Sequence, residues 1–379
     1  MRKIFFWLHL CLGVAAGAVI LVMSVTGVLL TYEKQTIAWM DTRDLPPLSQ
    51  GSRLPVEDLI ERGRGADGKL PQAIAVSSDL AKPVQLTVGR ETRYVDPVNG
   101  NTLGAGHAGV RQFFRVVTEW HRYLGASGTS RLMGRPTGRA LTGAANLGFL
   151  FIVLSGLYLW LPKVWSKASL RAISWFRGGL AGKARDFNWH NVIGVWCFVP
   201  LVFIVLGGTV ISYPWASNLV FTLTGSELPR PTPPPKLDTL TQGPELTGLN
   251  ELFQQASARV PDWRTITLRM PASSSAPVTF VIDQGYAGQP QKRTTLSMNR
   301  ASGAVLASES YDDMNLGRRV RTWLRFVHTG EFYGLPGQTI AGVVTAGAAV
   351  LVYTGIALAL RRLLAWRSRT ARQTVAARA

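Results

Sequence analysis

The sequence is poor in cysteine, and the two that it has, Cys11 and Cys197, belong to no CxxC or CxxCH motif. A disulfide framework and a covalently attached haem are therefore excluded. A GxGxxG motif after a predicted strand and a P-loop are also missing, so no dinucleotide or nucleotide domain is expected here. Both cysteines lie within apolar runs and are expected to be small buried hydrophobic side chains.

Charged residues are absent from four long apolar runs. Each run has about 20 or more residues, the length that a bilayer core requires. One such run could be a buried helix of a soluble protein, but four of them predict an integral membrane protein. The first is too long for the core of a signal peptide and lacks a small-residue cleavage site, so we expect it to be retained. The predicted spans are 1–32, 140–162, 191–215 and 339–360.

Acidic residues are rare on one side of these spans, and this predicts the orientation. The N-terminal stub, the loop 163–190 and the tail 361–379 hold 14 of the 41 basic residues but only one of the 22 acidic ones, Asp186. The positive-inside rule places these parts, with both termini, in the cytoplasm. The long segments then face the periplasm of a bacterial inner membrane. The net charge of +19 reflects this asymmetry, so the expected partner is the lipid bilayer and not nucleic acid.

The chain contains an internal repeat. When His9 is aligned with His190, "HLCLGV" matches "HNVIGV" without a gap, and Gly27 meets Gly208. Each of these spans precedes a long segment that reads as one short helix followed by short strands. The turns "DPVNG" and "NRASG" lie at equivalent places, opened by Asp or Asn and closed by Gly. The expected helices are 55–63 and 249–260, and the expected strands are 73–77, 83–88 and within 93–104, then 265–270, 277–283 and within 294–307.

Each half continues with an amphipathic helix that ends in histidine, at His121 or His328, and then with its second span. An even number of spans separates the copies, so both have the same orientation. The expected fold is a membrane α-helical protein with four transmembrane helices in two parallel repeats, each with an extracytoplasmic α+β domain, about a pseudo-twofold axis. The expected α+β domains are 33–109 and 216–315, and the histidine-bearing segments are 110–139 and 316–338.

Four of the five histidines are matched by the repeat. His9 and His190 begin outward-going spans at the cytoplasmic edge, and His121 and His328 precede inward-going spans at the outer edge. The pseudo-twofold axis would bring each pair face to face. Any one of them alone would be read as a hydrogen-bonded interfacial residue, but ionisable residues in membranes are rare and usually functional. Apolar neighbours also favour the neutral imidazole, which is the form that binds metals.

A pair of histidines fits haem better than zinc. Zinc prefers four ligands, and no carboxylate or thiolate recurs beside either pair. A b-type haem needs one or two axial ligands in an apolar slot between helices. Two histidines would fill both axial positions, which favours electron transfer. The sequence therefore predicts two b-type haems, one held by His9 with His190 and the other by His121 with His328. Glycines in these spans would admit the macrocycle, or simply allow close helix packing.

Other polar residues are secondary candidates. Arginines near the pairs could bind haem propionates, although most are expected to be ordinary interfacial charges. His107 has no repeat partner and is expected to be a solvated loop residue, with a substrate contact as the lesser alternative. The interiors of the spans contain no Asp, Glu, Lys or Arg, which counts against a transporter. The propionate candidates are Arg122, Arg139 and Arg325 for the outer pair and Arg185 for the inner pair.

The half-repeats, "YVDPVNGNTLG" and the run "WHRYLG … TGRALTG … SGLYLWLP" resemble the PepSY-associated transmembrane family over nearly the whole chain. The resemblance, closest to its siderophore-reductase and iron-uptake members, implies an oxidoreductase with two b-type haems. Such a protein would carry electrons from the cytoplasm to a ferric siderophore in the periplasm, whose oxygen donors hold Fe(II) far less tightly than Fe(III). The electron donor would be separate: reduced flavin, a flavoprotein or a quinol. The alternative is a membrane-anchored PepSY module that binds a protein and has no redox activity.

Overall fold

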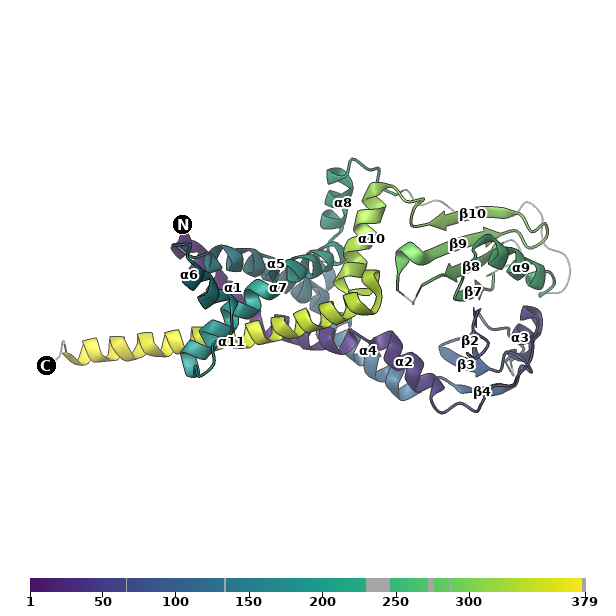
Figure 1. Ribbon diagram of the computed structural model, residues 1–379, viewed down its shortest axis with the longest axis horizontal. Coiled ribbons are helices and arrows are strands. Elements are labelled where there is room, and N and C mark those ends of the chain that lie inside the picture. The colour runs from purple at the N-terminus through teal and green to yellow at the C-terminus, as the bar shows by residue number, and fades with distance from the viewer. Residues whose placement is uncertain (66, 133, 230–245, 272–275, 286–287, 377–379) are drawn as a thin grey trace. The chain divides into compact units, whose positions relative to one another are not determined.

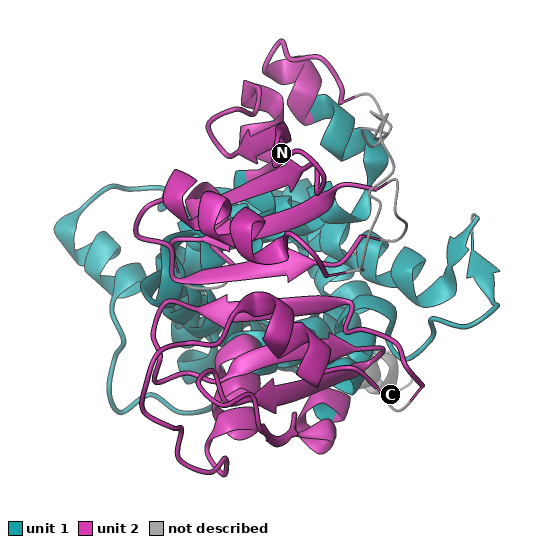
Figure 2. Ribbon diagram, turned by 90° about the vertical axis from the view of Figure 1, so that its right-hand side faces the viewer, with its two compact units in different colours: residues 1–33, 113–219, 323–379 teal, residues 34–112, 220–322 magenta. Residues whose placement is uncertain are grey.

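The computed structural model describes residues 1–379 except 66, 133, 230–245, 272–275, 286–287 and 377–379. The chain divides into two compact units, coloured separately in Figure 2. The first unit comprises 1–33, 113–219 and 323–379, and the second comprises 34–112 and 220–322. Part of the segment expected as the second α+β domain, 230–245, lies outside the described residues. This division means that the chain passes between the two units four times.

Four long apolar helices form the first unit, and each is long and apolar enough to cross a membrane. They are α1 (Arg2–Leu30), α5 (Thr137–Trp160), α7 (Gly182–Ser212) and α11 (Gly334–Ala376). Helix α1 packs against α5 and α11, and α7 packs against the same two helices, so α1 and α7 occupy opposite corners of a four-helix bundle. Figure 1 shows the four helices running alongside one another. The chain is a multi-pass membrane protein.

The helices extend beyond the apolar runs from which they were predicted. Helix α7 begins at Gly182, nine residues before the expected span at 191, so His190 lies within the helix and not at its start. Helix α11 continues through the basic segment after residue 360. The composition shows only where the uncharged run ends. The helical backbone hydrogen bonds continue beyond that point, through polar residues of good helix propensity.

Shorter elements connect the four long helices. The histidine-bearing segments form α4 (Ala108–Tyr123) and α10 (Leu316–His328), as the sequence predicts. Two further helices, α2 (Glu33–Thr42) and α8 (Pro214–Leu223), follow α1 and α7, and were not anticipated. The remaining elements are the hairpin β5 (Arg131–Leu132) and β6 (Arg135–Pro136), the helix α6 (Lys167–Ser174) and the 3-10 turn η2 (Glu331–Tyr333).

The second unit is built on one antiparallel sheet of eight strands, in the order β10-β9-β8-β7-β1-β2-β3-β4. The first four strands in the chain are β1 (Ala73–Ser77), β2 (Val84–Val88), β3 (Glu91–Val95) and β4 (Thr102–Ala105). The other four are β7 (Thr265–Arg269), β8 (Val278–Asp283), β9 (Arg293–Met298) and β10 (Val305–Ser310), with a 3-10 turn η1 (Pro290–Lys292) before β9. These strands lie where the alternating pattern predicts them.

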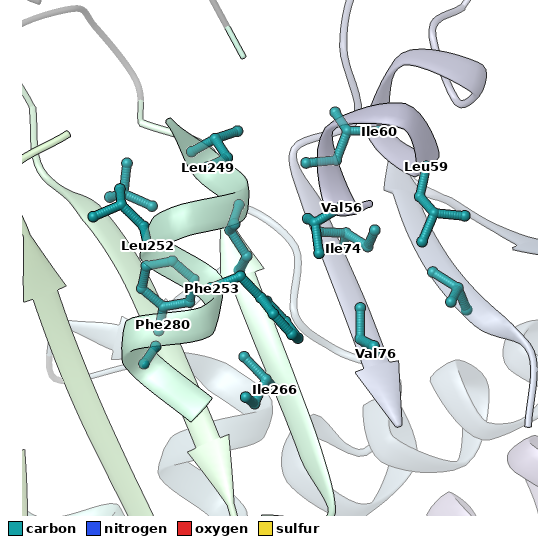
Figure 3. Packing of buried hydrophobic residues seen from close by; sticks show 14 of the residues in the cluster. Val56, Leu59, Ile60, Ile74, Val76, Leu249, Leu252, Phe253, Ile266 and Phe280 are labelled. Carbon is teal, nitrogen blue, oxygen red and sulfur yellow. The ribbon is translucent and has the colours of Figure 1, made fainter. Parts of the chain in front are cut away.

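One face of this sheet is covered by two helices, α3 (Val56–Arg62) and α9 (Leu249–Arg259). Alternate residues of β1 point at them, among which Ile74 and Val76 are fully buried (Figure 3). Each such aliphatic side chain stabilises the fold by about 1.5–3 kcal/mol relative to exposure. The two helices also cap each other, since the Glu57 backbone N–H donates to Asn250 Oδ1 and the Asn250 N–H donates to Glu57 Oε1, both at 3.2 Å.

The two predicted turns have the expected chemistry. Asp96 Oδ1 accepts from the Val98 N–H at 2.8 Å, and Asn299 Oδ1 accepts from the Ala301 N–H at 2.8 Å. The closing residues are Gly100 and Gly303, with φ of +69° and +70°. Only glycine adopts this left-handed conformation without strain.

The structure differs from the expectation of a separate α+β domain in each half. Strands β1 and β7 pair from Ala73↔Arg269 to Ser77↔Thr265, which joins the two half-sheets, and one hydrophobic core contains residues of both. A four-stranded half-sheet with one short helix exposes an edge strand and buries few side chains. Pairing the two central edges removes both edges and merges two small cores, and alternation within a single strand does not reveal its partner.

A buried carboxylate fixes α2 to the rest of the second unit. The Asp41 side chain is fully buried; it accepts from the Tyr94 hydroxyl at 2.9 Å and from the His107 backbone N–H at 2.5 Å, and it forms an ion pair with Arg111. Burial and the Asp41 carboxylate raise the pKa of Tyr94, so its hydroxyl stays protonated and keeps donating.

Candidate functional site

Two histidines from opposite corners of the bundle form the inner pair. His9 of α1 and His190 of α7 have ring centres 6.4 Å apart and ring planes at 81°. Each ring lies against the span that follows it in the same half of the chain. A Cβ on Gly156 would lie 3.4 Å from His9 Cε1, and a Cβ on Gly355 would lie 3.3 Å from His190 Cε1. Each imidazole therefore packs directly on a helix backbone.

The outer pair comes from the two amphipathic helices. His121 of α4 and His328 of α10 have ring centres 6.3 Å apart and ring planes at 56°. His121 lies against α1, where a Cβ on Gly27 would be 3.4 Å from its Cε1. His328 lies against α7, where a Cβ on Gly207 would be 2.8 Å from its Cβ. The structure thus brings together both pairs that the sequence predicts.

The ends of α4 and α10 are fixed against the spans that follow them. The Thr142 hydroxyl donates to the Arg122 carbonyl at 3.0 Å, next to His121. Gly138 leaves no room for a Cβ beside the Tyr123 backbone. In the other half, Gly337 approaches the backbone of Gly330 in the same manner. These backbone contacts set the position of the histidine at the end of each amphipathic helix.

The Nδ1 atoms of the inner pair both meet hydroxyl groups. His9 Nδ1 lies 3.0 Å from Ser155 Oγ, and His190 Nδ1 lies 2.9 Å from Thr354 Oγ1. Each hydroxyl donates its own proton to a carbonyl one turn earlier in its helix, at Ile152 and at Val350, over 3.2 and 2.8 Å. A hydroxyl whose proton is used in this way accepts from the imidazole, so Nδ1 carries the hydrogen.

The outer pair follows the same pattern with one difference. His121 Nδ1 lies 3.0 Å from Thr26 Oγ1, and this hydroxyl donates to the Val22 carbonyl at 2.6 Å. His328 Nδ1 donates directly to the Ile204 carbonyl at 2.7 Å. In the alignment that matches His9 with His190, Thr26 corresponds to Gly207, which has no hydroxyl and lets the ring reach the backbone. A carbonyl oxygen only accepts, so Nδ1 of His328 must be the donor.

All four imidazoles are therefore expected to hold their hydrogen on Nδ1, and Nε2 of each makes no hydrogen bond with the described residues. This is the arrangement of metal-binding histidines, which donate the other ring N–H to a neighbouring acceptor that fixes tautomer and orientation. A merely structural histidine in an apolar bundle would be expected to use both ring nitrogens in hydrogen bonds within the protein.

The spacing within each pair indicates how two histidines would share a metal ion. A metal–imidazole bond of about 2.0–2.1 Å, with the nitrogen about 1.1 Å from its ring centre, puts opposite ligands about 6.3 Å apart between ring centres and tetrahedral neighbours about 5 Å apart. The observed 6.4 and 6.3 Å fit opposite ligands. Among the described residues, no group of three or more His, Cys, Asp or Glu could form a closed metal site. The donor set therefore fits haem and does not fit structural zinc.

The arginines proposed as propionate partners have other contacts. Arg185 forms an ion pair with the buried Asp186 and stacks on Trp189. Arg139 reaches the Ile211 carbonyl at 3.5 Å. The other two stack on the residues that follow them, Arg122 on Tyr123 and Arg325 on Phe326. None of these contacts is with a histidine of either pair, so their role as propionate partners stays a prediction.

The fifth histidine and the cysteines lie apart from the two pairs. His107 is exposed at the start of α4, where its Nδ1 accepts from the Val110 N–H at 3.2 Å. It is a loop residue, as expected, and it also caps the helix. Cys197 is buried between spans, as predicted, whereas Cys11 is exposed on α1. Apolar residues on that surface of a span face lipid, so the composition alone did not separate the two cases.

The model of the PepSY-associated TM region matches residues 6–362. The chain belongs to this family. The match includes both histidine pairs, the sheet of the second unit, all of α5 and α7, and most of α1 and α11. No curated protein matches the chain.

The hydroxyl partners of the histidines were missed in the sequence. Ser155 and Thr354 each precede a glycine that touches a histidine ring, and "SGLYLWL" and "TGIALAL" are equivalent in the repeat. The equivalence of the two segments is visible in the sequence, but it does not by itself show that the hydroxyl groups contact histidines. Thr26 gave no such indication, because its equivalent is Gly207 and the repeat does not preserve it.

Proposed function

We propose that the chain is a transmembrane di-haem b oxidoreductase, with His9 and His190 as axial ligands at the inner site and His121 and His328 at the outer site. The observation that carries this proposal is the close approach of the two rings in each pair, with every Nδ1 hydrogen-bonded and no Nε2 bonded to a residue that the structure describes. Bound haem would supply one-electron transfer, and two histidines would leave no open position for dioxygen.

The location of the pairs supports transfer across a membrane. On α1, the inner site is at His9 and the outer site is at Thr26, which contacts His121. These positions are 17 residues apart (26 − 9), or about 25 Å of helix at 1.5 Å per residue. The same interval separates His190 from Gly207 on α7. This distance approaches the hydrocarbon thickness of about 30 Å. The two sites thus lie toward opposite faces of one bundle.

Matched contacts support the proposal that the chain is a duplicated unit with two parallel repeats. Asn146 of the first half packs against Gly208 of the second half, and Thr345 of the second half packs against Gly27 of the first. The two glycines correspond when His9 is aligned with His190. Each half also supplies one histidine to each pair. A pseudo-twofold axis along the membrane normal accounts for these correspondences.

For the direction of transfer, we propose an inner membrane location, with both termini in the cytoplasm and the second unit in the periplasm. The basic loop and tail support this orientation. The substrate that we propose is a ferric siderophore, bound outside, with a separate cytoplasmic electron donor. One electron converts Fe(III) to Fe(II), for which hard oxygen donors have much lower affinity, so reduction would release the metal for uptake.

The decisive experiment is the haem content of the purified chain. Protein from haem-replete cells is expected to contain two haems per chain, with the spectrum of a low-spin, six-coordinate b-type haem. Reduced protein should then convert a ferric siderophore to Fe(II), which a ferrous chelator traps as a coloured complex. A colourless preparation would overturn the redox proposal and leave the alternative function, a membrane-anchored PepSY module without redox activity.

A further inference from the structure

The loop between α5 and α7 forms a pocket at the end of the bundle that holds His9 and His190. Its volume is about 640 Å³. Its side chains combine two basic groups with two large aromatic rings and one small residue. The residues that line it are Ala168, Arg171, Trp175, Phe176 and Arg177.

Side chains of the adjoining spans hold the backbone of this pocket in place. The indole N–H of Trp160 donates to the Ile173 carbonyl at 3.2 Å, and that of Trp196 donates to the Ser174 carbonyl at 2.8 Å. The buried amide of Asn188 donates to the next carbonyl and accepts from the Arg177 N–H, both at 3.1 Å. A loop fixed at three consecutive carbonyls presents its side chains in a defined arrangement.

The guanidinium groups and aromatic rings that line the pocket are available to a ligand. Among the residues that the structure describes, neither Arg171 nor Arg177 has a side-chain hydrogen bond or ion pair. Trp175 and Phe176 are 61% and 59% exposed. Large exposed aromatic rings beside unpaired guanidinium groups suit a ligand that has both a flat ring and an anionic group.

The pocket also adjoins the inner histidine pair. The rings of Phe176 and Trp189 are 6.4 Å apart in an edge-to-face arrangement. Trp189 directly precedes His190 in α7. A redox ligand in this pocket would therefore be separated from the inner site by one aromatic contact and one peptide unit.

We propose that this pocket binds reduced flavin mononucleotide, with the phosphate on Arg171 and Arg177 and the ring system against Trp175 and Phe176. The inference rests on the proposed function, for which it supplies the electron entry site. A quinol has no anionic group and would leave both arginines unmatched. An anionic phospholipid would match the arginines but not the aromatic rings.

The electrons and protons of this step balance. Reduced flavin gives up two electrons and two protons and becomes oxidised flavin. The two electrons reduce two ferric ions on the opposite side of the membrane, one each. The two protons stay on the donor's side.

Binding is tested with the full chain in nanodiscs of zwitterionic lipid, by quenching of the fluorescence of oxidised flavin mononucleotide, which has the same phosphate and ring framework as the reduced donor. The Arg171→Ala/Arg177→Ala variant is expected to bind about tenfold or more weakly, because two charge-assisted hydrogen bonds are lost. The matched control is Arg367→Ala/Arg369→Ala, which removes the same charge from the exposed tail and should bind as the unchanged chain does. Riboflavin, which has no phosphate, should bind weakly to every variant.

Electron entry is tested by stopped-flow absorption in the haem region. At a subsaturating concentration of reduced flavin mononucleotide, the haem of the pocket variant should be reduced at least about tenfold more slowly than that of the unchanged chain. Dithionite should reduce the haem of all variants at equal rates. Equal flavin affinity in the pocket variant and the tail control would overturn the inference. A second result would also overturn the inference: flavin binding is lost in nanodiscs of anionic lipid, but the rate of haem reduction is unchanged. The pocket would then be a binding site for lipid headgroups.

Failure here is distinguishable from failure of the proposed function. A protein with two haems that does not bind flavin mononucleotide would overturn only the donor assignment. A protein without haem would overturn the function, and flavin fluorescence would still report whether the pocket binds its ligand.

Discussion

The imidazole of His9 stands nearly perpendicular to that of His190, with ring centres 6.4 Å apart across the bundle. Their Nδ1 atoms lie within hydrogen-bond distance of hydroxyl groups on two different helices, α5 and α11. Two side chains that were only packing together would not need separate hydroxyl partners. The proposal that the two rings are ligands of one haem iron leads to a prediction for each residue that creates this arrangement.

Replacement of one histidine should affect one site. His190→Ala is expected to lower the haem content from two to about one per chain, because a single histidine in an apolar slot holds haem weakly. The remaining haem should keep the spectrum of the outer site, since His121 and His328 are about 25 Å of helix away. Haem is measured by pyridine haemochrome absorbance against protein concentration.

The matched control for this variant is His107→Ala, which removes the one histidine outside the pairs. It is expected to retain both haems. Loss of both haems, or of neither, in His190→Ala would show that the pairing is wrong. His328→Ala should give the complementary result, with loss of the outer haem only.

The hydroxyl partners should tune the site without being ligands. Thr354→Val keeps the shape of the side chain but removes the acceptor for His190 Nδ1. The affinity of the inner site for haem should fall about 10- to 100-fold, as is common when a partner of a metal-binding histidine is lost. Thr354→Ser keeps the hydroxyl, so its inner site should have the haem affinity of the unchanged chain. Haem titration of the apoprotein and the electron paramagnetic resonance of the inner site provide the measurements, and an unchanged result for both would contradict this role.

Much of this architecture could be predicted because it follows from simple periodicities. The absence of charge located the spans, and alternation with turn residues located the strands. The repeat then paired His9 with His190 and His121 with His328, although they are far apart in the sequence. The chemistry of the turns at Asp96 was also predictable, because an Asp side chain and a closing glycine satisfy the turn locally.

The remaining features depend on contacts that no local pattern encodes. The pairing of β1 with β7 joins the edge strands of the two half-sheets. Both strands alternate apolar and polar residues in the same way, so this alternation does not reveal that they pair. The start of α7 depends on Asp186 and Asn188, two polar residues that are buried by the loop and by α11. The direct bond from His328 to a carbonyl requires Gly207 in place of the Thr26 of the other half.

Gly207 should be sensitive to the smallest substitution. In Gly207→Ala, the new Cβ would lie 2.4 Å from the Leu324 carbonyl oxygen and 2.8 Å from the His328 Cβ. Helix α10 would have to move, so the outer haem should be lost or strongly weakened and the melting temperature should fall. The control is Gly128→Ala in the loop after α4, where a Cβ meets nothing within 4 Å. Equal haem content in the two variants would contradict the close approach.

The ion pairs of Asp186 should stabilise the end of the bundle near the inner site. Its carboxylate is 1% exposed and accepts from Arg185 and from Arg361 of α11, at 2.9 and 3.0 Å. Asp186→Asn keeps the volume but removes the charge, which leaves two guanidinium groups without their counter-ion. Both arginines are partly exposed, so we expect a loss of about 1–3 kcal/mol, less than for a fully buried pair. Thermal unfolding of the detergent-solubilised protein should show a lower melting temperature, whereas Asp44→Asn, which breaks an exposed pair with Arg43, should leave it nearly unchanged. If both variants melt at the same temperature, the bridge between α7 and α11 does not contribute to stability.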